Sequence, residues 1–222
     1  MGDRQVLDPR RRRHDAKRAT IVAEAWALAR RDGLTGIGLR ELAERVDLRQ
    51  PSLYAYFDSK LALYDAMFAD GNRQLLERVA GLRHVEDPRE ALVEFVEFCV
   101  RFSSEDVTRH QLLFQRTIPG FEPSPGSYAV ATEFYAEATA RLAAAGITGP
   151  ADGELFSAVV SGLAHQQVAN DPGGERWVRH ARRATTMFLA DAARTAPKTA
   201  HPKSAHPKTA AHPKTARRRE SR

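Results

Sequence analysis

Residues 39–67 read LRELAERVDLRQPSLYAYFDSKLALYDAM, and this stretch decides the fold of the N-terminal part of the chain. Apolar residues at helical spacing give each of two short helices one buried face: Leu42, Ala43 and Val46 in the first, Leu53 and Phe57 in the second. The break between them is short, and Pro51 suits the first turn of the second helix, where its missing N–H is not needed. This spacing predicts a helix-turn-helix.

The second of these helices carries polar side chains suited to nucleic acid. In a helix-turn-helix, the second helix enters the major groove of DNA and presents polar groups to base edges and phosphates. The exposed positions expected here are Arg49, Gln50, Ser52, Tyr54 and Tyr56. Lys60 lies in the first turn of the helix that restarts after Asp58 and Ser59, so it is placed to meet a phosphate.

The same stretch resembles the DNA-binding signature of the TetR family of transcriptional regulators (TetR/AcrR-type repressors). The matching features are R-x-L-A in the supporting helix, L-Y-x-[HY]-F in the recognition helix and the immediate [DNP]-[SN]-K-x-x-L restart. The resemblance covers residues 15–68 closely, and SGLAHQQVANDPGGERW (161–177) also resembles the last two helices of many members. It implies an all-α protein of about nine helices, with a three-helix DNA-binding domain and a C-terminal helical domain for ligand binding and dimerisation.

The resemblance also implies roles for individual residues. Arg40 would reach a base, typically guanine, while Gln50, Pro51 and Ser52 would begin base reading. Gln is suited to bidentate pairing with adenine and Pro to packing on a thymine methyl. Tyr54, Tyr56 and Lys60 would contact phosphates. Three alternatives stay open: the tyrosines could be packing aromatics, Arg40 could only form an ion pair with Glu44 at i+4, and the helix-turn-helix could be degenerate and no longer bind DNA.

The chain departs from the family pattern at three positions. Asp47 stands where many members have the turn glycine, so either the turn tolerates a left-handed Asp or its geometry differs. Gly38 replaces the usual Thr that opens the supporting helix, which weakens a cap. Tyr56 replaces the histidine of L-Y-x-H-F.

Four regions follow from the pattern along the chain. Residues 1–13 are expected to form a flexible basic arm, in which Arg11, Arg12 and Arg13, with Lys17 beyond them, follow phosphates or enter a minor groove. Residues 14–60 form the helix-turn-helix domain and 61–195 the helical effector-binding and dimerisation domain. Residues 196–222, rich in Lys, Pro and Ala, are expected to be a disordered basic tail. Helical periodicity predicts helices over residues 14–32, 39–46, 50–57, 60–79, 89–103, 106–117, 127–145, 152–170 and 175–195, and no segment alternates as a strand does.

Aromatic residues concentrate in the helices of the middle domain. The resemblance implies a cavity for a small-molecule effector between them, although a plain hydrophobic core accounts for the same residues. The predicted cavity residues are Phe95, Phe98, Cys99, Phe102, Phe114, Tyr128, Phe134, Phe156 and His165. His110, Gln115 and Gln166 are further candidate polar liners.

The last two expected helices each have an apolar side. The resemblance implies that such a pair forms a four-helix bundle with its copy in a homodimer. The predicted interface residues are Leu155, Val159, Leu163, Trp177, Ala181 and Phe188. A two-fold dimer places its recognition helices about 34 Å apart and reads a near-palindromic operator in double-stranded DNA.

Charge is unevenly distributed over the 222 residues, whose formal net charge is +6. Residues 1–60 hold thirteen basic and nine acidic side chains (+4), and residues 61–196 hold thirteen and eighteen (−5). Residues 197–222 hold eight basic side chains and one acidic (+7), which indicates non-specific attraction to DNA. This tail leaves open an architectural, histone-like DNA-binding protein as the alternative function, and also a solvated extension without function.

Other classes of protein are not expected. No Gly-rich phosphate loop, zinc-protease motif or serine nucleophile elbow occurs, so the chain is not expected to be an enzyme, and no cofactor or metal is expected. One cysteine, Cys99, builds no disulfide framework. No apolar run reaches the length of a membrane span and no secretory signal is present, so the protein is expected in the cytoplasm. The predicted function is a ligand-responsive homodimeric repressor, with activation as an open variant.

Overall fold

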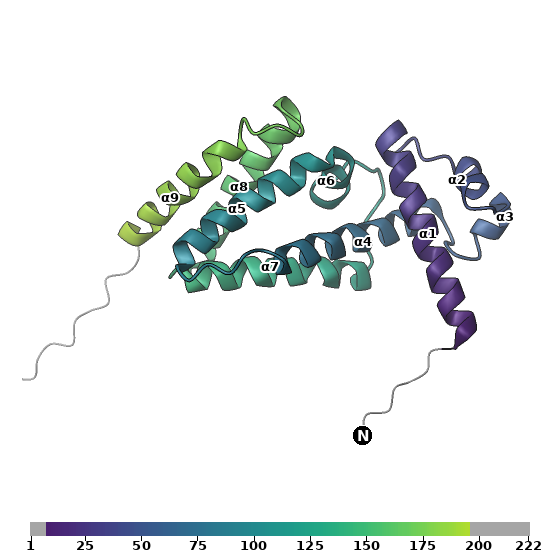
Figure 1. The fold of residues 1–222 in the computed structure, drawn as a ribbon, viewed down its shortest axis with the longest axis horizontal. Coiled ribbons are helices and arrows are strands. Elements are labelled where there is room, and N and C mark those ends of the chain that lie inside the picture. Colours follow the sequence, from purple (N-terminus) through teal and green to yellow (C-terminus); the bar gives the residue numbers. More distant parts are fainter. Residues whose placement is uncertain (1–7, 196–222) are drawn as a thin grey trace, which may run out of the picture.

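The computed structural model describes residues 8–195, and these form nine α-helices and no β-strand, which confirms the all-α prediction (Figure 1). The helices are α1 (Pro9–Asp32), α2 (Leu39–Arg45), α3 (Gln50–Leu53), α4 (Lys60–Ala80), α5 (Pro88–Glu105), α6 (Val107–Phe114), α7 (Pro125–Ala144), α8 (Pro150–Asn170) and α9 (Val178–Thr195). The expected basic tail, 196–222, lies outside the described residues. None of the helices within 8–195 combines the length and hydrophobicity that crossing a membrane requires.

The first helix begins earlier than the sequence pattern predicts. Asp8 caps α1 by accepting a hydrogen bond from the backbone N–H of Arg10 at 3.0 Å, and Pro9 occupies the first helical position. Because this cap and proline favour a helix start, Arg11, Arg12 and Arg13 belong to α1. The expectation of a flexible arm is therefore wrong for residues 9–13, and residues 1–7 lie outside the described part.

Helices α1, α2 and α3 and the start of α4 enclose one hydrophobic core. Its buried members come from these four helices and from the loops after α1, α2 and α3, with one residue each from α6 and α7. They include Ile21, Trp26, Leu28, Leu34, Ile37, Leu42, Leu53, Phe57, Leu63, Met67, Leu112 and Ala131. The apolar spacing in the sequence predicted the α2 and α3 members of this core correctly. Packing of these faces turns the opposite face of α3 outward.

The turn between α2 and α3 uses a left-handed aspartate. Asp47 has φ of 54°, and among residues 8–195 it is the non-glycine residue with positive φ. The backbone N–H of Leu48 then donates to the carbonyl of Ala43 at 2.9 Å, which closes the end of α2. Of the two possibilities left open at this position, the turn geometry is kept and Asp47 adopts the left-handed conformation.

Helix α4 runs from the DNA-binding domain into a second, larger helical domain, where α7 lies beside it (Figure 1). Helix α5 packs against both α8 and α9, and a second core forms between these elements. The buried members of that core include Leu75, Leu92, Phe95, Val96, Phe102, Leu142, Phe156, Ala181 and Phe188. Figure 1 places α8 and α9 on the other side of the molecule from α2 and α3.

Helix boundaries in this second domain differ from the predictions by a few residues. Pro125 begins α7 behind a Ser124 cap, and Pro150 begins α8, so both helices start two residues earlier than predicted. Both shifts have one cause, since proline is favoured in the first helical turn. Helix α9 begins at Val178, after a turn that Gln167 organises.

Candidate DNA-binding and ligand sites

The outer face of α3 gathers most of the predicted base-reading residues. Gln50, Pro51 and Ser52 are exposed, as is Arg49, whose backbone caps the helix. Tyr54, directly after α3, is also exposed. Leu53 on the inner face of α3 and Phe57 in the segment after it are buried in the core, so they hold the exposed row in place. This arrangement is suited to a major groove, and contact with DNA stays a prediction.

Tyr56 connects the end of the recognition region to α1. Its ring is half-buried and stacks on His14 with 4.8 Å between centroids. Its backbone carbonyl accepts a hydrogen bond from the Arg18 guanidinium at 3.2 Å. One face of the Tyr56 ring therefore has the packing role that the sequence left open, and contact of its hydroxyl with a phosphate stays a prediction. The contact also brings the first turns of α1, with exposed Arg11, Arg12 and Arg13, beside the recognition region.

The two lysines predicted to contact phosphates both donate hydrogen bonds to backbone carbonyls. Lys17 donates to the carbonyl of Val46, at the end of α2, and Lys60 donates to that of Thr35 at 2.9 Å. Burial lowers the pKa of Lys60 from its ordinary value. Both lysines thus position the helix-turn-helix, and each ammonium group has further donors for a phosphate.

Arg40 forms the ion pair that the sequence left open as its alternative role. Its Nε lies 3.1 Å from a carboxylate oxygen of Glu44, one turn along α2. The Arg40 side chain is 85% exposed, and such pairs contribute about 0–1 kcal/mol. A DNA phosphate or base can therefore compete for this guanidinium.

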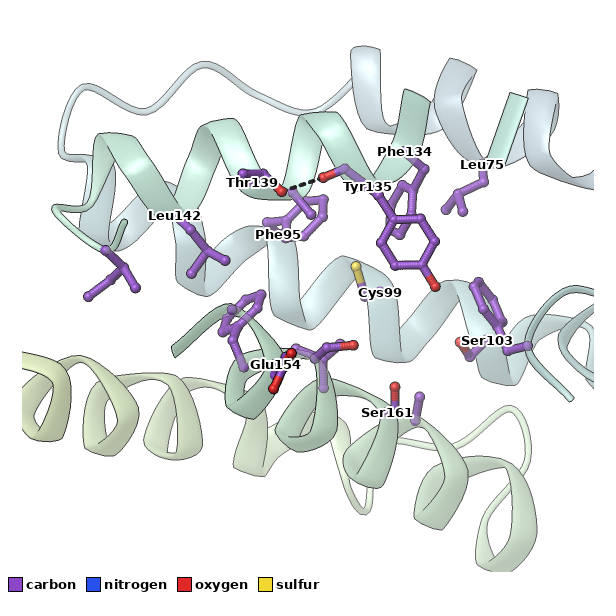
Figure 2. Close-up of a pocket in the computed structure, with 18 of the residues that line it drawn as sticks. Leu75, Phe95, Cys99, Ser103, Phe134, Tyr135, Thr139, Leu142, Glu154 and Ser161 are labelled. Atoms are coloured by element: carbon purple, nitrogen blue, oxygen red, sulfur yellow. Dashed lines mark hydrogen bonds between the residues drawn. The ribbon is translucent and has the colours of Figure 1, made fainter. Parts of the chain in front are cut away.

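The second domain contains a cavity of about 960 Å³ between α5, α7 and α8, with α4 and α6 at one end (Figure 2). Figure 2 shows Cys99 of α5 pointing into the space between α7 and α8. Seven predicted cavity residues line it: Phe95, Cys99, Phe102, Phe114, Phe134, Phe156 and His165. The candidate polar liners His110 and Gln115 line it as well.

Three predicted cavity residues lie elsewhere. Phe98 packs into the domain core against Phe102, with 5.7 Å between ring centroids, because it faces away from the cavity on α5. Tyr128 lines a neighbouring hollow of about 450 Å³ between α4, α6 and the loop before α7. Gln166 is exposed on α8 and accepts hydrogen bonds from Asn170. Assignment of these three to the cavity is wrong.

Sequence reasoning missed one whole face of α7 and one of α8. The α7 face comprises Tyr135, Ala138, Thr139 and Leu142, and the α8 face includes Ser157, Ser161 and Ala164. Both sets recur at helical spacing, which is the signal that could have identified them. Small polar residues on such a face are equally typical of a solvated helix, so this spacing alone does not indicate a cavity.

The cavity wall is apolar and almost free of charge. Burial raises the pKa of the Cys99 thiol to about 12, so it stays protonated. Burial, with a smaller contribution from His165, lowers the pKa of His110 to about 4, so its imidazole is neutral at pH 7. Glu154, exposed on α8, is the one acidic liner among the described residues, and none of the liners is Lys or Arg.

A chain of hydrogen bonds links this cavity to the DNA-binding domain. Arg109 of α6 donates to the carbonyl of Phe102 at 2.9 Å and to the side-chain oxygen of Gln74 at 3.1 Å. Gln74 donates to Asp70 at 2.7 Å, and the same carboxylate oxygen accepts from the Trp26 indole of α1 at 3.0 Å. The chain thus runs from a cavity residue through α6 and α4 to the core of the DNA-binding domain.

The predicted dimer interface needs correction at two positions. Ala181 and Phe188 are buried within the protomer, where the Phe188 ring lies 5.4 Å from that of Phe156. They face inward because α9 turns its most apolar side onto α5 and α8. Leu155 is exposed, and Val159, Leu163 and Trp177 are half-buried, so these four remain candidates. Met187, 61% exposed on α9, is an additional candidate that the sequence did not indicate.

Within residues 8–195, no three His, Cys, Asp or Glu side chains gather as a metal site requires.

Comparison with known proteins points to one family. Residues 21–67 match the family model described as "Bacterial regulatory proteins, tetR family". No curated protein sequence matches the chain.

Several solved structures share the fold over most of this chain. The multidrug binding protein EbrR, complexed with imidazole, is 24% identical with a TM-score of 0.59, covering 85% of this chain and 97% of that one. The TetR family regulator PfmR from Thermus thermophilus is 20% identical with a TM-score of 0.56, covering 77% and 97%. The fatty acid degradation regulator FadR from Bacillus halodurans is 12% identical with a TM-score of 0.62, covering 78% and 94%. At these identities the likeness shows the fold, while the tetR-family match resides in the helix-turn-helix.

Proposed function

We propose that this chain, which carries a tetR-family DNA-binding domain on the fold of TetR-family transcriptional regulators, is a homodimeric repressor that a small molecule releases from its operator. The observation that carries the proposal is the exposed row of Gln50, Pro51, Ser52 and Tyr54 on a helix anchored by buried residues. An effector site is supported by the apolar cavity in the second domain.

Operator recognition begins at the N-terminal end of α3. Gln50 has the donor and acceptor for bidentate pairing with adenine, and Pro51 offers an apolar surface to a thymine methyl. Arg49 and Tyr54 flank these positions and are free to meet phosphates. Arg11, Arg12 and Arg13, held on α1 beside Tyr56, add cationic contacts with the backbone or the minor groove.

Dimerisation through the outer faces of α8 and α9 suits this arrangement. The outer face of α8 carries Leu155 and the small exposed residues Ala158 and Gly162, which allow close helix approach. Exposed Met187 on α9 adds apolar area. Because α8 and α9 lie opposite α3, a two-fold dimer presents both recognition helices outward, about 34 Å apart on one face of the DNA.

Release follows if the effector and DNA favour different relative placements of the two domains. An effector in the cavity contacts Phe102, whose carbonyl is bound by Arg109, and the hydrogen bonds of Gln74, Asp70 and Trp26 continue to α1. Coupling of about 1–3 kcal/mol is typical, and it acts in both directions, so DNA weakens effector binding equally.

The proposal is tested by selecting bound sequences from random double-stranded DNA and footprinting the product. We expect a near-palindromic site, and Gln50→Ala or Tyr54→Ala should each weaken binding by about 1–3 kcal/mol. Glu133→Ala replaces an exposed residue of α7, far along the chain from α3, and is the control that should leave DNA binding unchanged. Light scattering should show that all variants remain dimers. Unchanged footprints of both α3 variants would contradict the site assignment.

An architectural DNA-binding protein is the second candidate, because residues 197–222 carry a net charge of +7. A chain ending at Thr195 separates the two functions. For the repressor, specific binding persists and the slope of log K against log salt falls by about six, since roughly seven phosphate contacts are lost. Complete loss of operator binding favours the architectural function.

A further inference from the structure

We propose that the effector is a neutral, largely aromatic molecule with a hydroxyl group, and that the imidazole of His110 hydrogen-bonds this hydroxyl. The inference rests on the proposed function in taking the 960 Å³ cavity as the effector site. It deepens that function by assigning the chemistry that the cavity recognises.

His110 is the unsatisfied polar group of the cavity wall. It is 5% exposed on α6, and its Nδ1 is buried without a hydrogen-bond partner. Within residues 8–195 the imidazole makes no hydrogen bond through either nitrogen, while its ring packs 5.4 Å from that of Phe114. Nδ1 has almost no accessible surface, so a ligand in the cavity meets the ring at Nε2. A hydrogen bond between Nε2 and such a ligand contributes about 0.5–1.5 kcal/mol net.

A hydroxyl suits this imidazole whichever ring nitrogen carries the proton. At pH 7 the ring is neutral, because burial lowers its pKa to about 4. A neutral imidazole has one donor and one acceptor, and a hydroxyl is both donor and acceptor. A carboxylate gains no ion pair from this ring, and an ammonium group can use only its acceptor.

The rest of the wall disfavours charge. None of the described lining residues is Lys or Arg, so an anion would lose its hydration without a counter-ion. The guanidinium of Arg141 lies 5.2 Å from the Phe95 ring, behind the wall, and its charge is paired with Glu137 at 2.8 Å. Exposed Glu154 is a single carboxylate at the solvent side, where water screens its attraction for a cation.

Five phenylalanine side chains make the wall suited to flat apolar rings. Phe95 and Phe134 stack with 5.8 Å between centroids, and Phe102, Phe114 and Phe156 line the remaining sides. Aromatic pairs in offset or edge geometry add about 0.5–1.5 kcal/mol beyond burial of their area. A cavity of this size accommodates a ligand of several rings.

The test uses four probes of one shape: 2-naphthol, naphthalene, 2-naphthoate and protonated 2-naphthylmethylamine. Equilibrium dialysis against the full chain without DNA measures binding directly. We expect 2-naphthol to bind about tenfold more tightly than naphthalene, as one added hydrogen bond predicts, and the two ions to bind most weakly. In His110→Phe the preference for naphthol over naphthalene should disappear, and in His110→Asn, which keeps a donor and an acceptor, part of it should persist.

His84→Phe, an exposed histidine before α5, is the matched control and should keep the full preference. Circular dichroism establishes that each variant is folded. Equal binding of naphthol and naphthalene, tightest binding of either ion, or no naphthol binding at saturation overturns the inference. Loss of the preference in His165→Phe with retention in His110→Phe overturns the assignment to His110.

Operator binding measured with the same probes separates this inference from the proposed function. If naphthol binds through His110 without changing operator affinity, the recognition chemistry holds and the effector role fails. If other compounds release the operator while naphthol fails to bind, the effector role holds and the proposed chemistry fails.

Discussion

The guanidinium carbon of Arg109 lies 3.6 Å from the centroid of the Phe102 ring. Phe102 lines the cavity, whereas Arg109 is buried on α6 and bonded to Gln74 of α4. A cation stacked this closely on a desolvated ring contributes about 2 kcal/mol. The contact therefore ties the cavity wall to the helix that enters the DNA-binding domain.

The Arg109–Gln74 hydrogen bond should appear as an energetic coupling. Chemical unfolding of Arg109→Met, Gln74→Ala and the double variant should give an interaction free energy of about 0.5–3 kcal/mol, because the residues share one buried network. Gln166→Ala combined with Arg109→Met is the control, and it should be additive, since Gln166 has no part in the network. If the effects of Arg109→Met and Gln74→Ala on the free energy of unfolding are additive, the two residues are not energetically coupled.

Asp47 should be a strained position that glycine relieves. Its φ of 54° lies in the left-handed region, which glycine adopts freely and most L-residues adopt at a cost of about 1–2 kcal/mol. Asp47→Gly should raise the free energy of unfolding in urea, and Asp47→Ala should lower it by about 1 kcal/mol. Asp58→Gly is the control. Asp58 does not have a positive φ, so glycine there should not raise the free energy of unfolding. Equal stability of the three Asp47 forms would refute the strain.

Gln167 should be essential to the connection between α8 and α9. Its side chain is fully buried; its oxygen accepts from the backbone N–H of Trp177 at 2.6 Å and of Val178 at 3.2 Å. Its amide nitrogen donates to the carbonyls of Asp171 and Gly174. Gln167→Ala leaves these groups unpaired and should lower the free energy of unfolding by about 2–4 kcal/mol. Gln166→Ala, the exposed neighbour, should change it by less than about 0.5 kcal/mol.

Stability should fall on acidification through a window set by His110. Burial lowers its pKa from 6.5 to about 4, so between these values the unfolded chain binds more protons than the folded one. The stabilising contribution is therefore complete above pH 6.5 and is lost as the pH falls toward 4, by a few kcal/mol in all. Urea unfolding from pH 7 to 5 should show this slope.

His110→Phe should flatten that slope, whereas His84→Phe should leave it unchanged. Carboxylates such as Glu105, whose pKa is lowered by its hydrogen bond with Arg78, contribute only at more acidic pH. A slope unaltered in His110→Phe would place the responsible group elsewhere.

Local patterns in the sequence predicted the all-α class, the helix-turn-helix and the exposed row on α3. These features depend on neighbours within one or two helical turns, such as Leu53 and Phe57 at i and i+4, and periodicity records such relations directly. The left-handed conformation of Asp47 could be named as a possibility because many members of the resembling family have glycine at this turn position, and glycine favours a positive φ.

The tertiary structure alone decided which apolar residue faces which partner. Phe95 and Phe98 lie within one turn of α5, yet Phe95 lines the cavity and Phe98 does not. Phe188, predicted at the dimer interface, packs instead in the core of its own protomer. The hydrogen-bond chain from Trp26 to Arg109 joins residues more than eighty positions apart. Hydrophobic burial is non-directional, so a sequence records that a side chain will be buried, and only the packing of helices decides against what.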